Sequence, residues 1–206
     1  KLIAEIRASG WRIRKIFALE GLFEGEAVET LSRKELERVS LLKTPSKAVA
    51  IVEIPRHTLH IEQLKGQLAL VLDEVQNPGN LGTIIRIADW FGIEHIFCSQ
   101  GTVDAFNPKT VQATMGALAR VKLHYCNLPA LIASLEDVPV FGTFLDGDNM
   151  YHEELAGIGL IVMGKKGNGV SPEVSRLINR RLYIPNYPQE RETSESLNVA
   201  VATSII

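Results

Sequence analysis

From Gln67 onward the chain alternates short apolar runs with helical segments, and this alternation constrains the fold more than any other feature. Leu68 to Leu72 is a continuous apolar run, as expected of a parallel strand that is covered on both faces. Further strands are expected at 95–98, 121–125, 138–145 and 160–163, and helices at 81–91, 108–118, 129–135 and after Ser171. This spacing predicts an α/β fold, a parallel sheet with helices on both faces. Ligands bind such sheets at the carboxyl ends of the strands, where the unusual loops of this chain fall.

The first 56 residues differ in character from the rest. A short basic strand at 11–18, helical spacing at 31–39 and a strand at 49–52 indicate a small domain at 1–56, followed by a linker at 57–66 and the main domain at 67–206. The basic residues of this part are Arg33, Lys34, Arg38, Lys43, Lys47 and Arg56. They fit a solvated helix face and loop as well as an RNA-facing surface. The net charge of −2 means that any nucleic acid would have to meet such a local patch.

Composition limits the other possibilities. The sequence has no apolar stretch of the about 18 residues that would span a bilayer and no recognisable secretory signal, so a cytoplasmic protein is expected. Cys98 and Cys126 lack metal-ligand spacing and are interpreted as buried free thiols, while His57 and His60 are expected to be exposed rather than metal-bound. No metal is therefore expected. The chain starts without Met and stops within an apolar helical run, so both ends are expected to be clipped.

The first unusual loop leads into Asn80-Leu-Gly-Thr-Ile-Ile-Arg86. Asn80 is expected at the start of a helix, and Arg86 lies nearly two turns later. Asn80 could be an N-cap and Arg86 an arginine that extends its charged end to solvent. Because Arg86 is flanked by apolar residues, an acidic or phosphate partner is the other interpretation.

The second loop is Met163-Gly-Lys-Lys-Gly-Asn-Gly-Val-Ser171. Its glycines allow the backbone to approach a ligand closely. A Walker loop is excluded because Val170 stands where the phosphate-binding lysine belongs, and the dinucleotide pattern Gly-x-Gly-x-x-Gly is absent from the first strand turn.

The third loop lies in the stretch from Tyr183 to the C-terminal residue. A short strand stopped by Pro185 is followed by a polar loop at 186–195 and then a helix. Ser194 or Ser196 is expected to cap that helix. Ser196 and Asn198 are either capping groups or site groups, because buried polar groups there need partners.

Together these loops resemble the SpoU (TrmH-type) RNA ribose methyltransferases of the SPOUT superfamily over residues 67–206. The matching motifs are Asn80-x-Gly82-x-x-x-Arg86, Gly164-x-x-Gly167-x-Gly169-Val-Ser171, and Ile184-Pro185 with Ser196-Leu197-Asn198-Val199. Residues 1–56 are similar to the end of the family's small substrate-binding domain.

The resemblance implies a C-terminal trefoil knot whose loops hold S-adenosylmethionine (AdoMet). It also implies a homodimer with sites at the interface and rRNA or tRNA as partner. The implied cofactor-binding residues are Thr143, Gly164, Gly167, Ile184 and Leu197. The implied catalytic residues are Arg86, which acts on the ribose 2′-hydroxyl, and Asn80, Ser196 and Asn198, which position the RNA and the arginine.

Two features depart from the family pattern. Lys166 stands where the family usually has glutamate in the glycine loop. The stretch 188–195 makes the link between Ile184-Pro185 and Ser196 longer than usual, and it is either an RNA contact through Arg191 or a solvated loop. Lys166 favours an alternative, a non-catalytic RNA-binding relative with the same fold. A nucleotide-dependent α/β enzyme is a third possibility, disfavoured by the missing Walker lysine.

Overall fold

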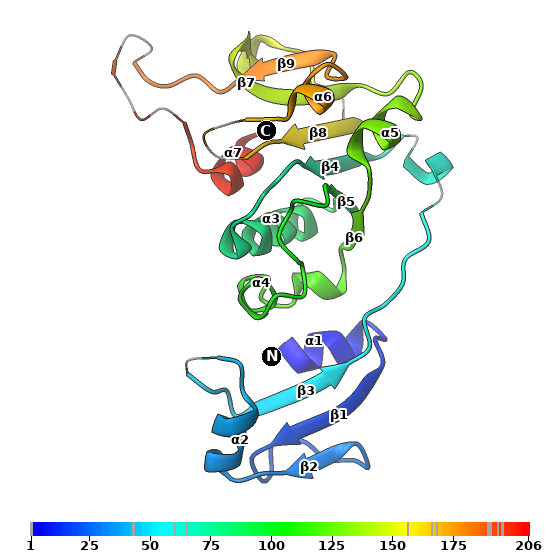
Figure 1. The fold of residues 1–206 in the computed structure, drawn as a ribbon, viewed down its shortest axis with the longest axis vertical. Helices are drawn as coiled ribbons and strands as arrows, with labels where there is room; N and C mark the ends of the chain where they lie inside the picture. Colours follow the sequence, from blue (N-terminus) through cyan, green and yellow to red (C-terminus); the bar gives the residue numbers. More distant parts are fainter. Residues whose placement is uncertain are drawn as a thin grey trace. The chain divides into compact units, whose positions relative to one another are not determined.

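The chain forms two compact units, Lys1–Arg56 and His57–Ile206 (Figure 1). The computed structural model describes residues 2–42, 44–59, 61–64, 66–155, 157–165, 167, 169–188, 191–192, 194 and 196–206, without the side chain of Gln63. Lys43, His60 and Lys166, which carried sequence-based expectations, lie outside these residues. Each unit is considered separately.

The first unit is a three-stranded sheet with two helices. The middle strand β1 pairs in parallel with β2 and antiparallel with β3, and Ile16 and Ala18 of β1 and Leu36 of α2 are buried. Its elements are α1 (Leu2–Ala8), β1 (Ile13–Ala18), β2 (Val28–Thr30), α2 (Arg33–Val39) and β3 (Ala48–Val52).

Local capping sets the start of α2. The Ser32 hydroxyl accepts from the N–H of Glu35, while the Glu35 carboxylate accepts from the N–H of Ser32, which is a capping box. Hydrogen bonds from Ser32 lower the pKa of Glu35. The helix therefore starts two residues later than the predicted 31–39.

The second unit contains a six-stranded sheet in the order β6-β5-β4-β8-β7-β9, and every strand pair described in it is parallel. The predicted parallel sheet is confirmed. Its strands are β4 (Leu68–Leu72), β5 (His95–Cys98), β6 (Lys122–Tyr125), β7 (Val140–Asn149), β8 (Gly159–Met163) and β9 (Arg180–Tyr183). The helices are α3 (Pro78–Trp90), α4 (Pro108–Ala113), α5 (Leu128–Ala133), α6 (Pro172–Ser175) and α7 (Val199–Ile205), with 3-10 turns η1 (Ile61–Leu64), η2 (Ala117–Ala119) and η3 (Met150–His152).

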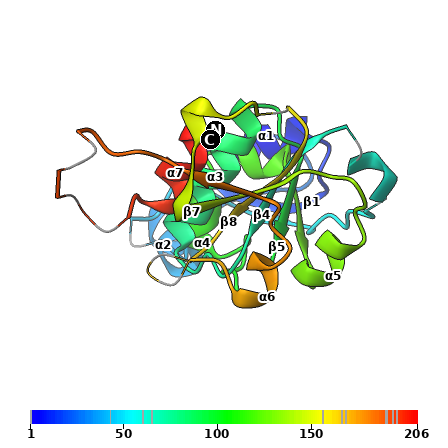
Figure 2. The same ribbon diagram turned by 90° about the horizontal axis from the view of Figure 1, so that it is seen from above.

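Helices cover both faces of this sheet: α3 and α7 lie on one side, and α5 and α6 on the other (Figure 2). On the α5 and α6 side, Val71 and Val162 of the central strands share one core with Leu131 and Val174. Alternate strand residues such as Leu70 and Leu72 are buried as well, because successive side chains of a strand point to opposite faces. A strand buried on both faces explains the unbroken apolar run.

Two predicted helix bounds in this unit are wrong by three residues or more. Helix α3 begins at Pro78, not Leu81, because the Asn77 side chain caps it by accepting from the N–H of Asn80 at 3.0 Å. The helix expected to reach Leu118 breaks at Met115 and Gly116, whose φ angles are 54° and 105°, and resumes as η2.

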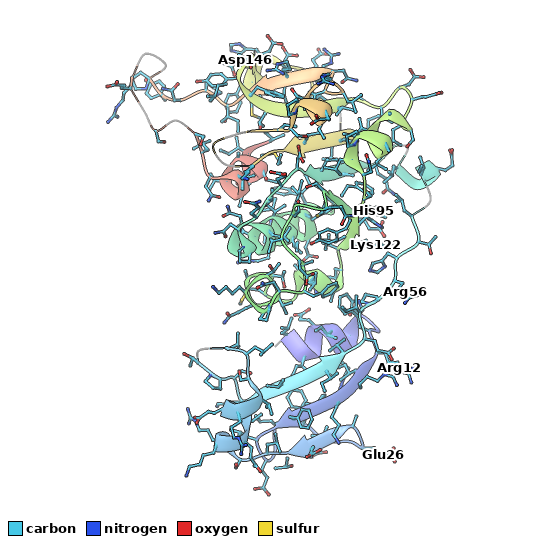
Figure 3. The ribbon with its side chains drawn as sticks, in the orientation of Figure 1. Arg12, Glu26, Arg56, His95, Lys122 and Asp146 are labelled. Atoms are coloured by element: carbon cyan, nitrogen blue, oxygen red, sulfur yellow. The ribbon has the colours of Figure 1, made fainter. Side chains whose placement is uncertain are left out.

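Three histidines lie at the β6 edge of the sheet. His95 Nδ1 is 3.0 Å from His124 Nε2, and the ring of the exposed His57 lies 6.4 Å from the ring of His124. Burial, followed by the positive charges of the other histidines and Lys122, lowers the pKa of His124 to about 4. His95 and Lys122 lie on neighbouring strands (Figure 3), and burial also lowers the pKa of His95 although Glu94 opposes the shift.

The histidine cluster predicts a loss of stability in mild acid. A histidine whose pKa is depressed in the folded state binds fewer protons than it does unfolded, so its neutral form stabilises the fold fully above about pH 6.5. That contribution is lost as the pH falls from 6.5 towards the folded pKa of about 4. Urea midpoints measured across this range should fall, and His124→Gln should flatten the dependence. His152→Gln, at an exposed site on η3, should leave the slope unchanged; equal slopes for wild type and His124→Gln would contradict the prediction.

Both cysteines are free, Cys98 buried as expected and Cys126 only half-buried. Burial raises the pKa of each thiol, so both remain protonated at neutral pH and are poor nucleophiles.

Candidate functional site

A pocket of about 550 Å³ lies where the second and third unusual loops meet, near the carboxyl ends of β8 and β9. Its walls come from the middle of β7, the glycine loop after β8, the end of β9 and the start of α7. The lining residues are Thr143, Phe144, Leu145, Met163, Gly164, Lys165, Gly167, Gly169, Tyr183, Ile184, Ser196, Leu197, Val199 and Ala202. All five residues predicted to bind the cofactor lie in this lining, as does Ser196. The pocket occupies the side of a parallel sheet where ligands are expected.

The glycine loop folds back on itself. Lys165 and Gly169 exchange two backbone hydrogen bonds, each of 2.9 Å, in an isolated antiparallel bridge. A Cβ on Gly164 would lie 2.3 Å from the carbonyl carbon and 2.4 Å from the carbonyl oxygen of Gly169. Gly167 and Gly169 adopt φ of 92° and 68°, which glycine adopts without strain. Glycine at 164 is therefore required by contact, and at 167 and 169 by backbone conformation.

The β7 wall is shaped by an irregularity. The pairing of β7 with β9 shifts register between Thr143 and Asp148, and β7 runs to Asn149, further than the predicted 138–145. Phe144 and Leu145, which lie in the shifted segment, line the pocket. The Arg181 guanidinium lies 3.5 Å from the centroid of the Phe144 ring and donates to Asp146 Oδ1 at 2.6 Å. Asp146 lies at the β7 and β9 end of the sheet (Figure 3), and the hydrogen bond from Arg181 lowers its pKa.

Asn198 caps the helix that closes the pocket. Its side-chain oxygen accepts from the N–H groups of Ala200 at 2.9 Å and Val201 at 3.4 Å. The prediction that Ser194 or Ser196 caps this helix is wrong, because the helix begins only at Val199. Asparagine is among the best N-cap residues, and here it leaves Ser196 to line the pocket.

The Asn198 side chain also connects two of the three motifs. Its amide donates to the side-chain oxygen of Asn80 at 3.1 Å, although 118 residues separate the two. Asn80 lies in the first turn of α3 and is not its cap, which corrects the capping interpretation. One asparagine thus fixes the start of α7 and orients the other asparagine on α3.

Arg86 lies on the same helix as Asn80, and its side chain is exposed to solvent. The structure therefore agrees with the interpretation in which Arg86 extends its charged end to solvent. There the guanidinium needs no protein partner and is open to an anionic ligand. Gly82 has a different task, because a Cβ there would lie 2.4 Å from Cβ of Ala113 and 2.9 Å from the carbonyl oxygen of Thr110. The glycine of this motif lets α3 and α4 pack closely.

Sequence reasoning missed Asp73, which it placed only in a turn. This carboxylate is 4% exposed and its Oδ2 accepts from the N–H of Ser171 at 2.7 Å. An acidic residue just after a buried strand was the only available signal.

Within the described part of the chain, no helix is long and apolar enough to cross a membrane. In the same residues, no group of three or more His, Cys, Asp or Glu side chains is arranged to hold a metal ion.

Comparison with known proteins supports the motif assignment. Residues 67–206 match the SpoU rRNA Methylase family. The chain is 36% identical over 180 residues to the 23S rRNA (guanosine(2553)-2′-O)-methyltransferase RlmP of Bacillus subtilis, which covers 85% of this chain and 69% of that protein. It is 30% identical over 207 residues to the 23S rRNA (guanosine-2′-O-)-methyltransferase RlmB of Acinetobacter baylyi, over 94% of this chain and 81% of that one.

Solved structures agree. A TrmH-family protein from Porphyromonas gingivalis superposes with a TM-score of 0.85 and 37% identity, over 100% of this chain and 84% of that one. The AdoMet-bound rRNA methyltransferase from Sinorhizobium meliloti gives a TM-score of 0.83 and 27% identity, over 99% of this chain and 81% of that one. With the family match over residues 67–206 and these relatives, the chain belongs to the SpoU rRNA methylase family.

Proposed function

We propose that the protein is an AdoMet-dependent RNA methyltransferase that transfers a methyl group to a ribose 2′-hydroxyl of rRNA or tRNA. The observation that carries this function is that the glycine-loop motif and the C-terminal motif line one pocket, while Asn198 of the C-terminal motif is joined to Asn80 of the first motif at 3.1 Å. The B. subtilis relative is named as a 23S rRNA guanosine 2′-O-methyltransferase, and the S. meliloti neighbour is AdoMet-bound.

The pocket fits AdoMet. Its volume of about 550 Å³ lies in the range of small-molecule sites, about 300–1,000 Å³. Gly164 lacks the side chain that would collide with the returning strand of its loop, and this arrangement leaves backbone groups available to a ligand. Thr143, Gly164, Gly167, Ile184 and Leu197 would hold AdoMet, which supplies the electrophilic methyl group when bound.

Arg86 supports the transfer electrostatically. A ribose hydroxyl is a poor nucleophile, and methyl transfer from it requires alignment and stabilisation of the developing alkoxide. An arginine stays protonated, so Arg86 presents a fixed positive charge to that oxygen. Asn80, Asn198 and Ser196 orient the RNA backbone and the arginine. The 2′-hydroxyl restricts the substrate to RNA.

Calorimetric titration with AdoMet and with S-adenosylhomocysteine tests this function. Wild type is expected to bind with a micromolar Kd, and the Lys166→Glu variant, which restores the residue usual in the family, addresses the alternative. Binding only by Lys166→Glu would favour the non-catalytic RNA-binding relative. No binding by either protein would contradict the cofactor assignment.

A homodimer is part of the proposal. Trp90 is 85% and Phe91 63% exposed at the end of α3, and Val201 of α7, a helix that packs on α3, is 48% exposed. Large exposed apolar side chains on helices are frequent at protein interfaces. Light scattering should give twice the chain mass for wild type, and Trp90→Glu should shift the mass towards that of one chain. A wild type with the mass of one chain at micromolar concentration would contradict it.

The trefoil knot is proposed for the region between β9 and α7. Strand β9 lies at the edge of the sheet, yet α7 packs on α3, so the chain must return across the ends of β7 and β8. A crystal structure traced through 184–198 tests this path. A trace that passes outside the loops after β7 and β8 would exclude the knot.

RNA contacts outside the pocket are proposed for two segments. Arg33, Lys34, Arg38, Lys47 and Arg56 of the first unit are all exposed, which is consistent with contacts to phosphates. Acidic residues such as Glu37, 4.0 Å from Arg33, keep the solvated-face interpretation open. Arg191 lies four residues after Tyr187, which is 93% exposed. An exposed tyrosine can stack on an RNA base, and a nearby arginine can contact a phosphate. Cytoplasmic localisation remains a prediction.

A further inference from the structure

A single buried residue contacts both ends of the glycine loop, one end through its carboxylate and the other through its backbone N–H. Asp73 is the first residue after β4, and its Oδ2 accepts from the N–H of Ser171, where the loop ends, at 2.7 Å. Its own N–H donates to the carbonyl oxygen of Met163, where the loop begins, at 2.9 Å. Asp73 therefore sets the distance between the two ends of a loop that lines the pocket.

Burial makes this contact strong. The residue is only 4% exposed, and a buried carboxylate is costly unless it is hydrogen-bonded. Hydrogen bonds to charged groups contribute more than neutral ones and become shorter. Among the described residues, the ion pair from Lys165 Nζ to Glu74 Oε2 also connects these segments, but it is 3.5 Å long and partly exposed to solvent, so it contributes little.

The turn that follows Asp73 is also held by hydrogen bonds. The N–H of Glu74 donates to the Ser99 hydroxyl at 2.9 Å, and the N–H of Val103 donates to the carbonyl oxygen of Val75 at 3.0 Å. The same short turn ends at Asn77, which caps α3. A fixed turn thus connects the glycine loop to the helix that carries Asn80 and Arg86.

We infer that Asp73 is a positioning residue, which holds the glycine loop in the shape that binds AdoMet and in register with α3. This inference rests on the proposed function. Loss of its carboxylate frees the Ser171 end of the loop and leaves the N–H of Ser171 without this acceptor. AdoMet binding then has to order the loop, and the entropy lost in doing so weakens the affinity for AdoMet.

The test is AdoMet binding by calorimetry together with steady-state kinetics. Asp73→Ala is expected to raise the Kd for AdoMet about 10- to 100-fold, the range of a hydrogen bond to a charged group. Asp73→Asn retains an oxygen that can accept from Ser171, so it should recover much of that loss. The KM for AdoMet should rise while the KM for RNA stays near its wild-type value, a split that general unfolding would not produce. Glu74→Gln is the neighbouring control and should bind as wild type does.

If Asp73→Ala fails to fold, a variant of Ser171, the donor of the same hydrogen bond, tests the inference. Ser171 has a φ of −59°, which proline adopts, so Ser171→Pro removes the N–H that donates to Asp73 together with the Ser171 hydroxyl. Ser171→Ala removes the hydroxyl alone and is the control for its loss. Ser171→Pro should raise the Kd by a similar factor. Wild-type affinity in a folded Asp73→Ala or in Ser171→Pro would overturn the inference. A wild type that does not bind AdoMet would instead contradict the proposed function.

Discussion

Arg86→Ala is expected to lower the rate of methyl transfer about 100- to 1,000-fold, the effect of removing one group that stabilises charge developing in a transition state. The exposed guanidinium makes no contribution to the core, so unfolding and AdoMet binding should stay close to wild type. Single-turnover transfer from labelled AdoMet into RNA measures the rate. Arg86→Lys should recover only part of it, because lysine keeps the charge but not the planar set of donors.

The matched control for Arg86 is Arg176→Ala. Arg176 is also an exposed arginine, but it follows α6 on the other side of the sheet, so its loss should leave transfer unchanged. An Arg86→Lys variant with the full wild-type rate would contradict the electrostatic role, and an Arg86→Ala variant with that rate would remove Arg86 from the mechanism.

Gly164→Ala is expected to raise the Kd for AdoMet about 100-fold, because a displacement of about 1 Å in a site can have an effect of this size. The added Cβ would lie 2.4 Å from the backbone nitrogen of Val170 and 2.3 Å from the carbonyl carbon of Gly169. Backbone atoms cannot rotate away as a flexible side chain would, so the loop has to open. Calorimetry measures the affinity, and urea unfolding reports the cost to the fold.

Gly157→Ala provides the control for that substitution. Nothing lies within 4 Å of a Cβ at Gly157, and its backbone does not have the positive φ that favours glycine. The affinity of Gly157→Ala for AdoMet should match that of wild type. Wild-type affinity in Gly164→Ala would mean that the glycine loop does not form the pocket wall in solution.

The sheet could be predicted because its strands are short, apolar and regularly spaced. A run such as Leu68–Leu72 is compatible with few structures other than a strand covered on both faces. The location of the site followed from the same regularity, since loops at the carboxyl ends of parallel strands meet at one edge.

The sequence alone could not identify which of several neighbouring residues caps a helix. Asn77 and Asn80 have the same preference for the N-cap, and only Pro78 at the first helical position indicates which one is used. Ser194, Ser196 and Asn198 present the same ambiguity, resolved by where α7 begins.

Contacts between distant parts of the chain left no local signal. The bond from Asn198 to Asn80 and the bond from Ser171 to Asp73 join residues 118 and 98 positions apart. The register shift beside Phe144 depends on pairing with β9, which follows much later in the chain. Tertiary structure alone supplies these interactions.

Transfer of a deuterated methyl group from AdoMet into bulk ribosomal and transfer RNA, followed by digestion to nucleosides and mass spectrometry, tests the central claim most directly. The label is expected on the ribose of a 2′-O-methylnucleoside, and it should disappear with Arg86→Ala. Label on a base would contradict the proposed chemistry, and no label in RNA despite AdoMet binding would favour a non-catalytic RNA-binding protein.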